Sequence, residues 1–406
     1  MRKFLAGLLA LLCIPVSASA QQDVEAARRT VAAIENLLKQ RPADPTLWFF
    51  LSRFQAQAGD AAASIAALEK AGELGDGFLP DAAGFAAVWR DTKFQAIRSR
   101  LEARLPRLDF APTAFEVPDR ALVPEGIAHD GASRSFFVGS VAKKKLLRVD
   151  EDGTVSEFAG ADALVDPVLG VAVDTPRRVL YAVATSALTE EGRKSRRNAV
   201  VAFDIDSRRM LQRYPVPQAQ QLNDVAVAPG GRVFASDSAS GAIYEIAVKG
   251  PGPSRELVPP GKVGGSNGLA ASPDGRRLFV AHSTGLAVVD IATGELKRVA
   301  NETRESVAAI DGLYEWQGQL VGVQNVTNPG RVIIATLSRD GGAVTRVQTL
   351  LSHHHSALYE PTTGAVTDRG FFLLAATGVT HYNAQGKIDR PDEIPAPTIL
   401  RIPLPR

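Results

Sequence analysis

The sequence of 406 residues is nearly devoid of cysteine, since its single cysteine, Cys13, lies in the N-terminal stretch described below. The rest of the chain therefore has neither a disulfide framework nor a thiolate metal site. It also lacks a strong excess of one charge, with 46 lysine and arginine residues against 44 aspartate and glutamate residues. This balance argues against a general binder of nucleic acids or of anionic membranes.

Long apolar runs are missing as well, apart from one near the N-terminus, so we expect no membrane span. We also expect no nucleophile elbow of the Gly-x-Ser-x-Gly type, which disfavours serine-hydrolase chemistry. The hydrophobic content of 45% is that of a globular protein and excludes a largely disordered chain.

Residues 1–20 have the pattern of a secretory signal peptide, with a basic start, a short apolar core and small residues at the end. The apolar core is too short for an uncleaved membrane anchor. Leu12 precedes Cys13 where a lipoprotein cleavage site needs a small residue, so lipidation is not expected. We predict cleavage before Gln21 and export to the periplasm or the medium.

Residues 21–106 are rich in helix-forming residues and are predicted to be a small helical domain. The stretch 44–75 resembles one tetratricopeptide repeat, flanked by helices expected over 24–39 and 80–105. Such a domain serves either as a groove for a protein partner or as a prop packed on the next domain. We favour the prop, because one repeat has little concave surface. The apolar side chains of the last helix are expected in the core: Phe85, Val88, Trp89, Phe94 and Ile97.

A repeat fills the remainder of the chain, residues 107–406, which we predict to be one mainly β domain. Each unit has a polar or small start, a short apolar strand, a turn and a second strand, with 44 to 54 residues between successive starts. Several short strands per unit at this period indicate a six-bladed β-propeller. The strand expected over 113–117 would pair with the one over 398–402 and close the ring. The six starts are Glu125, Leu169, Asn223, Asn267, Asp311 and Thr363.

Four of these six starting residues carry carboxylate or amide oxygens, which are the ligands of hard cations. Because an innermost strand begins at the mouth of a propeller's central channel, these side chains can converge there. The alternative is that they only form turns, since Asn-Gly and Asp-Gly are common turn dipeptides. We favour a site for one divalent cation, with Ca²⁺ expected and Mg²⁺, Mn²⁺ or Zn²⁺ as alternatives.

The second strand of each unit returns to the same mouth, so its last residues should form a second ring around the site. Among them, Asp237 or His282 is a candidate general base. The others are Ser140, Gln324 and Asn325, of which Ser140 and Gln324 are predicted to contact substrate.

Some polar residues lie outside this pattern. His129, at the far end of its strand, is expected to be structural. Residues 353–355, all histidine, are expected to form a lid or a weak metal site. The basic run within 193–197 is interpreted as a solvated face, with an anion-binding loop as the alternative.

Four motifs stand in an order that resembles a known family: Pro124-Glu125-Gly126, Leu222-Asn223-Asp224, Ser266-Asn267-Gly268-Leu269 and Ile310-Asp311-Gly312-Leu313. This order is similar to that of the senescence marker protein, gluconolactonase and luciferin-regenerating enzyme family of six-bladed propellers, which also resemble paraoxonase-type lactonases. The resemblance covers residues from about 120 to 403. It implies Glu125, Asn267 and Asp311 as ligands of a central cation. It implies Asn223 as a fourth group that contacts the cation or the substrate.

The resemblance implies an exported hydrolase of a lactone or related ester, with Asp311 as an additional candidate base or nucleophile. The alternative is a non-catalytic propeller that binds a small ligand or a protein partner, with a structural cation. The signal peptide and the helical domain lie outside the family pattern.

Overall fold

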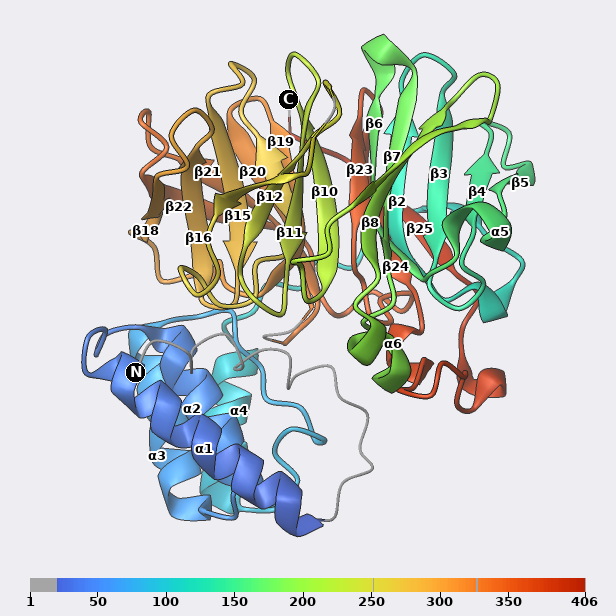
Figure 1. Ribbon diagram of the computed structural model, residues 1–406. Helices are drawn as coiled ribbons and strands as arrows, with labels where there is room; N and C mark the ends of the chain where they lie inside the picture. The colour runs from blue at the N-terminus through green and yellow to red at the C-terminus, as the bar shows by residue number, and fades with distance from the viewer. Residues whose placement is uncertain (1–19, 251, 326–327, 406) are drawn as a thin grey trace.

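The computed structural model describes residues 20–250, 252–325 and 328–405. The predicted signal peptide lies outside this range except for its last residue. Figure 1 shows two parts, an N-terminal helical segment and a ring of β-sheets, with the helices gathered at one end of the strands.

The helical segment contains α1 (Ala20–Leu38), α2 (Pro45–Gln57), α3 (Ala61–Leu74) and α4 (Thr92–Glu102). Aspartate carboxylates cap three of these helices by accepting backbone N–H groups, as Asp44 does from Thr46 and Leu47. The helix predicted over 80–105 is shorter, because residues 82–90 form turns and Asp91 caps a new start at Thr92.

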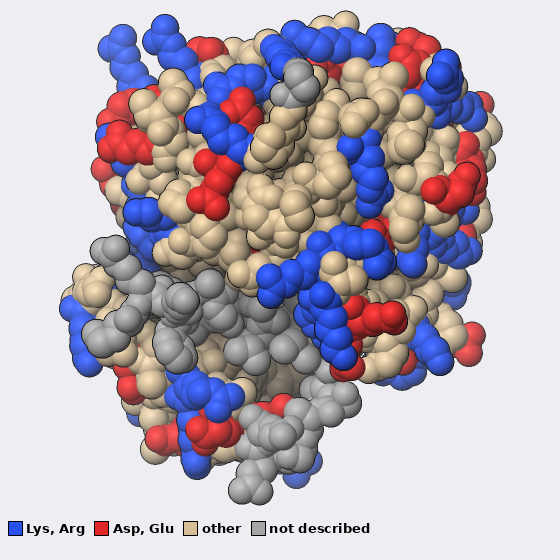
Figure 2. All heavy atoms as spheres, viewed as in Figure 1, with Lys and Arg blue, Asp and Glu red and all other residues tan. Residues whose placement is uncertain are grey.

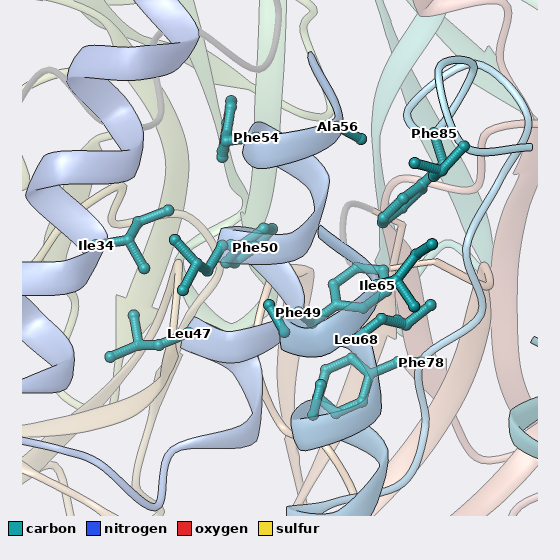
Figure 3. Close-up of a cluster of buried hydrophobic side chains, with 14 of the residues drawn as sticks. Ile34, Leu47, Phe49, Phe50, Phe54, Ala56, Ile65, Leu68, Phe78 and Phe85 are labelled. Atoms are coloured by element: carbon teal, nitrogen blue, oxygen red, sulfur yellow. The ribbon is translucent and has the colours of Figure 1, made fainter. Parts of the chain in front are cut away.

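The helical segment has its own apolar core, in which Phe49 stacks on Phe78 with ring centroids 5.0 Å apart (Figure 3). Phe85 and Phe94 are fully buried in it, as predicted. Burial of these large side chains stabilises the segment by about 2 kcal/mol each. Other members of this core are Ile34, Leu47, Phe50, Ile65 and Leu68.

Six sheets form the ring, which confirms the predicted six-bladed propeller. Each blade has an innermost strand followed outward by antiparallel strands. The first three blades contain β2 (Pro124–Asp130), β3 (Ser135–Ser140), β4 (Leu146–Val149) and β5 (Val155–Ala159); β6 (Val168–Asp174), β7 (Val179–Thr185), β8 (Asn198–Asp204) and β9 (Met210–Pro215); and β10 (Leu222–Ala228), β11 (Arg232–Asp237), β12 (Ile243–Ile246) and β13 (Arg255–Val258).

The fourth and fifth blades contain β14 (Leu269–Ala271), β15 (Arg277–His282), β16 (Gly285–Asp290) and β17 (Leu296–Arg298); and β19 (Ile310–Trp316), β20 (Gln319–Gln324), β21 (Arg331–Leu337) and β22 (Ala343–Leu351), with β18 (Ala300–Asn301) added at the edge. Two short helices lie between strands, α5 (Ala161–Leu164) and α6 (Glu190–Ser195).

The sixth blade closes the ring with strands from both ends of the chain. It contains β23 (Gly364–Thr367), β24 (Gly370–Ala376), β25 (Thr398–Ile402) and, outermost, β1 (Thr113–Glu116). Leu400 pairs with both Leu373 of β24 and Thr113 of β1. The predicted closure is therefore confirmed, and it removes the open edge that the last blade would otherwise have.

The inner strands begin at the end of the ring that faces the helical segment, which we call the mouth. Here Asp76 hydrogen-bonds the backbone of residues 304 and 306, just before β19. Figure 2 shows acidic and basic side chains interspersed over one face of the molecule, as the balanced composition predicts. Among the described residues, no helix combines the length and apolar character needed to cross a bilayer.

Candidate functional site

Four inner strands have a local irregularity at their second residue, which is the starting residue of the repeat. The pairing of β2, β6, β10 and β19 with the next strand shifts register just after the first strand residue, at 124–127, 168–171, 222–225 and 310–313. A bulge of this kind redirects side chains and is frequent next to binding sites. It lies where the sequence predicted converging oxygen ligands.

Glycine follows the starting residue in five blades, and it permits neighbouring inner strands to approach closely. A Cβ atom on Gly268 would lie 2.3 Å from the backbone oxygen of Asp311. On Gly126 it would lie 2.2 Å from the backbone oxygen of Leu169. The Asn-Gly and Asp-Gly pairs of these motifs therefore bring adjacent blades together at the channel.

Asp311 is held by two amides in this channel. The Nδ2 atom of Asn267 donates to Oδ1 of Asp311 at 2.8 Å, and the Nδ2 atom of Asn325 donates to Oδ2. Asn325 also donates to the backbone oxygen of Pro361 at 2.9 Å. The structure thus places Asn267, Asn325 and Asp311 in contact, although they come from two blades.

Glu125 lies in the same electrostatic environment, with only 6% of its surface exposed. Its backbone oxygen accepts hydrogen bonds from the hydroxyls of Thr362 and Thr363, at 2.9 and 2.6 Å. Its carboxylate oxygen Oε2 is buried and has no hydrogen-bond partner among the described residues, and the same holds for Oδ1 of Asn325. Buried oxygens without partners are costly and need an explanation.

The pKa values of these carboxyls are raised. Burial is the main cause for Glu125, and the nearby Asp311 and Asp224 add to it. Burial also raises the pKa of Asp311 to about 6, against the opposing effect of the hydrogen bonds from Asn325 and Asn267. Carboxyls crowded in this way favour the uptake of a proton or of a cation.

These residues fit a hard divalent cation. The carboxylates of Glu125 and Asp311 share this site with the amides of Asn267 and Asn325. Two buried oxygens, one of a carboxylate and one of an amide, have no hydrogen-bond partner among the described residues. Calcium and magnesium select such oxygen sets. In the described ranges, no three His, Cys, Asp or Glu side chains are grouped as metal ligands, so the candidate site depends on amides as well as carboxylates.

The remaining starting residues contribute differently. Asn223 is partly exposed at the start of β10, and no hydrogen bond of its side chain is found among the described residues. Thr363 binds the Glu125 backbone through its hydroxyl and thereby links the sixth blade to the first. Leu169 is buried in the core that β6 shares with its neighbours.

Of the two candidate bases of the second ring, Asp237 is occupied by backbone donors, whereas His282 has a buried Nε2 with no hydrogen-bond partner among the described residues. The carboxylate of Asp237 accepts four backbone N–H groups, from residues 220, 221, 239 and 240. His282 is 2% exposed, and burial together with Arg298 and Arg41 lowers its pKa to about 3. These environments favour structural roles, so neither residue enters the mechanism proposed below.

Ser140 and Gln324, predicted to contact substrate, are also bound to the protein. The hydroxyl of Ser140 donates to the backbone oxygen of Leu122 and accepts from the N–H of Lys143. Gln324 donates to the backbone oxygens of Ser306 and Ala308, and its Oε1 accepts from Arg331. Their polar atoms shape the loops of the mouth and are not free for a ligand.

The expectation that the chain has no Gly-x-Ser-x-Gly segment is wrong, because residues 264–268 have this spacing. Ser266 is nevertheless no exposed nucleophile. It is fully buried, and its hydroxyl is 3.0 Å from the backbone oxygen of Asp237 and 3.3 Å from that of Ala242. The segment leads into strand β14 and not into a helix, so the elbow geometry is missing.

Asp224 is a channel residue that the sequence analysis did not assign. It occupies the position at which the other five blades have glycine, and this exception is visible in the sequence. Its carboxylate accepts the backbone N–H of Leu269 at 2.9 Å, and burial raises its pKa to about 7. With Tyr314 and His129 it lines a channel cavity of about 270 Å³.

The other histidines and the basic run lie away from the carboxyl pair. His129 packs on Phe136 with ring centroids 4.7 Å apart, at the far end of the channel. His354 and His355 bind Ser352 and the backbone of Ala111. Arg197, in the basic run, forms an ion pair with buried Asp166.

Comparisons with known proteins agree with this architecture. The family model "SMP-30/Gluconolactonase/LRE-like region" matches residues 123–348. A gluconolactonase from Xanthomonas campestris has 18% sequence identity, with 74% of this chain and 91% of that chain covered and a TM-score of 0.50. No match was found among curated protein sequences.

Two other solved structures match with lower scores. A luciferin-regenerating enzyme has 14% identity over 70% of this chain and 91% of its own, with a TM-score of 0.48. A virginiamycin B lyase from Staphylococcus aureus has 11% identity over 71% of this chain and 97% of its own, with a TM-score of 0.49.

Proposed function

Because this chain belongs to the SMP-30/gluconolactonase/LRE-like family, we propose that it hydrolyses a lactone or related ester, with one divalent cation bound at the mouth of the propeller. The observation that carries the proposal is the pair of buried oxygens beside Asp311, Glu125 Oε2 and Asn325 Oδ1, which have no hydrogen-bond partner in the part of the chain that the structure describes. Glu125, Asn267, Asn325 and Asp311 would hold the cation, and Asn223 would contact the cation or the substrate.

When bound, the cation supplies Lewis-acid polarisation of the ester carbonyl and stabilises negative charge on its oxygen. The protein's own contribution is positional. The amides of Asn267 and Asn325 fix the plane of the Asp311 carboxylate and favour its ionised form. Asp311 is therefore the candidate base that takes a proton from the attacking water.

The test is a panel of lactones assayed with calcium, with magnesium and with a chelator. We expect hydrolysis that the chelator abolishes and that falls by about 100-fold or more in Asp311→Ala, since this change removes a charged ligand and the base. Asp368→Ala, in the exposed turn between β23 and β24, is the matched control. Calcium binding without hydrolysis of any lactone would favour the ligand-binding propeller.

We also propose export, on the basis of residues 1–20 alone. Expression of the whole chain in a bacterium with a periplasm, followed by N-terminal sequencing, should give a protein that begins at Gln21. Recovery of an intact Met1 in the cytoplasmic fraction would contradict export.

A further inference from the structure

The loop that follows α3 binds the backbone just before β19. The N–H of Asp76 donates to the backbone oxygen of Arg304 at 2.7 Å, and the N–H of Ser306 donates to the backbone oxygen of Asp76 at 3.0 Å. The two segments run parallel, with Asp76 and Glu305 as bridge partners. The helical segment is thus bound to the stretch that leads directly to Asp311.

The same loop also binds a residue close to Asn325. The N–H of Leu79 donates to the backbone oxygen of Asn328 at 3.1 Å, and the Nδ2 atom of Asn328 donates to the Asp81 carboxylate at 2.6 Å. Asn328 lies three positions after Asn325, which donates to Asp311. The loop therefore contacts the chain at two places, shortly before Asp311 and shortly after Asn325.

Arg331 connects these contacts inside the protein. It is 1% exposed, and its Nε and Nη2 atoms donate to Gln324 and to the backbone of Ser306, at 2.7 and 3.1 Å. Gly77, in the loop after α3, packs directly against this arginine. A Cβ atom on Gly77 would lie only 2.3 Å from Nη2 of Arg331. A buried arginine with these partners fixes the end of β20 to the backbone of Ser306, four residues before β19.

We propose that residues 76–81 of the helical segment position Asp311 and Asn325, acting through Asn328 and Arg331, and thereby set the cation affinity of the mouth. The inference rests on the proposed function, since it concerns the same site. It assigns Asp81, Asn328 and Arg331 as positioning residues. A helical segment that serves only as a prop would support the fold without tuning the site.

The test exchanges one donor and one acceptor across the contact. Asn328→Asp places a second carboxylate against Asp81, and Asp81→Asn places a second amide against Asn328, with almost no change of shape. The double variant restores one donor and one acceptor. Calcium chloride is titrated calorimetrically into the full chain after removal of metal. We expect each single variant to bind calcium about 10- to 100-fold more weakly, and the double variant to recover most of that loss.

Thr284→Val is the matched control, because it removes the 3.2 Å hydrogen bond from Arg41, another contact between the helical segment and the propeller. We expect its calcium affinity to equal that of the wild type. Thermal unfolding in chelator tests whether each variant is folded. If Asn328→Asp does not fold, the comparison of Asp81→Asn with the wild type tests the positioning role. Wild-type protein that binds neither calcium nor magnesium in this titration, run with each chloride in turn, would overturn the proposed function, and this inference with it. Calcium binding that is unchanged in the single variants, or not restored in the double variant, would overturn the positioning role alone.

Discussion

At the scale of single residues, the carboxyls of Asp311 and Asp224 have pKa values of about 6 and about 7, well above the ordinary 3.8. Burial is the main cause in both, so the fold favours their protonated forms. Their effect on the stability of the metal-free protein is therefore most favourable below pH 4. It is lost progressively as the pH rises from about 4, where the unfolded carboxyls ionise, to the two raised values.

The raised pKa of Asp311 leads to a prediction for the pH dependence of calcium binding. Below pH 6 a proton competes with calcium for Asp311, so we expect the affinity to fall by about tenfold per pH unit. Calorimetric titration at pH 5, 6, 7 and 8, in two buffers of different ionisation enthalpy, measures both the affinity and the protons released. An affinity that is constant over this range would contradict the assignment of Asp311 as a ligand.

Replacement of Asp224 and of Asp237 by asparagine should have opposite effects on stability. Asp224→Asn removes a group that resists ionisation and keeps an oxygen for the N–H of Leu269. We expect it to stabilise the metal-free protein at pH 8 by about 1–3 kcal/mol. In Asp237→Asn the new amide would face four backbone N–H donors that the carboxylate accepts in the wild type. We expect this change to destabilise the folded protein by a similar amount. Urea unfolding in chelator compares the two, and equal signs would refute the argument.

At the scale of elements, the close contact of β14 with β19 depends on Gly268. A methyl group there would lie 2.3 Å from the Asp311 backbone oxygen and 2.5 Å from the N–H nitrogen of Leu313. We expect Gly268→Ala to cost about 1–3 kcal/mol and to weaken calcium binding, because Asp311 must shift. Gly131→Ala is the control, since nothing lies within 4 Å of its added carbon. Denaturation and calorimetry measure both effects, and equal results for the two glycines would remove the packing argument.

The elements of the propeller could be predicted because each blade repeats one local pattern. The predicted starts, Glu125, Asn223 and Asp311, are the second residues of β2, β10 and β19. What the pattern does not contain is the environment of each polar atom. The sequence alone did not show that the Asp237 carboxylate would accept four backbone N–H groups, because its donors come from a neighbouring turn as well as its own.

The proximity of two of the proposed site residues could be predicted for a similar reason. Residues at the start of inner strands converge in any propeller, so Asn267 and Asp311 were expected together, and they are hydrogen-bonded. The roles of Asp224 and Arg331 depend on contacts between blades and with the helical loop. Such contacts join residues far apart in the sequence, and neither periodicity nor composition encodes them.

At the scale of the whole molecule, the ring depends on the sixth blade. Leu400 of β25 is fully buried between strands from opposite ends of the chain. We expect Leu400→Ala to destabilise the propeller by about 2–5 kcal/mol. Leu211→Ala, in the outer strand β9 with 52% of the side chain exposed, should change stability by less than about 0.5 kcal/mol. Calorimetric unfolding of both variants is the measurement, and similar losses would contradict a special role for the closing blade.

This closure also orders events during synthesis. Strand β25 lies between β24 and β1, so the strand made last enters between two that were made earlier. A nascent chain can therefore complete five blades while the first β-strand still waits for its partner. The ring, and with it the convergence of Glu125 with Asp311, is sealed only once residues 398–402 are available to pair with both neighbours.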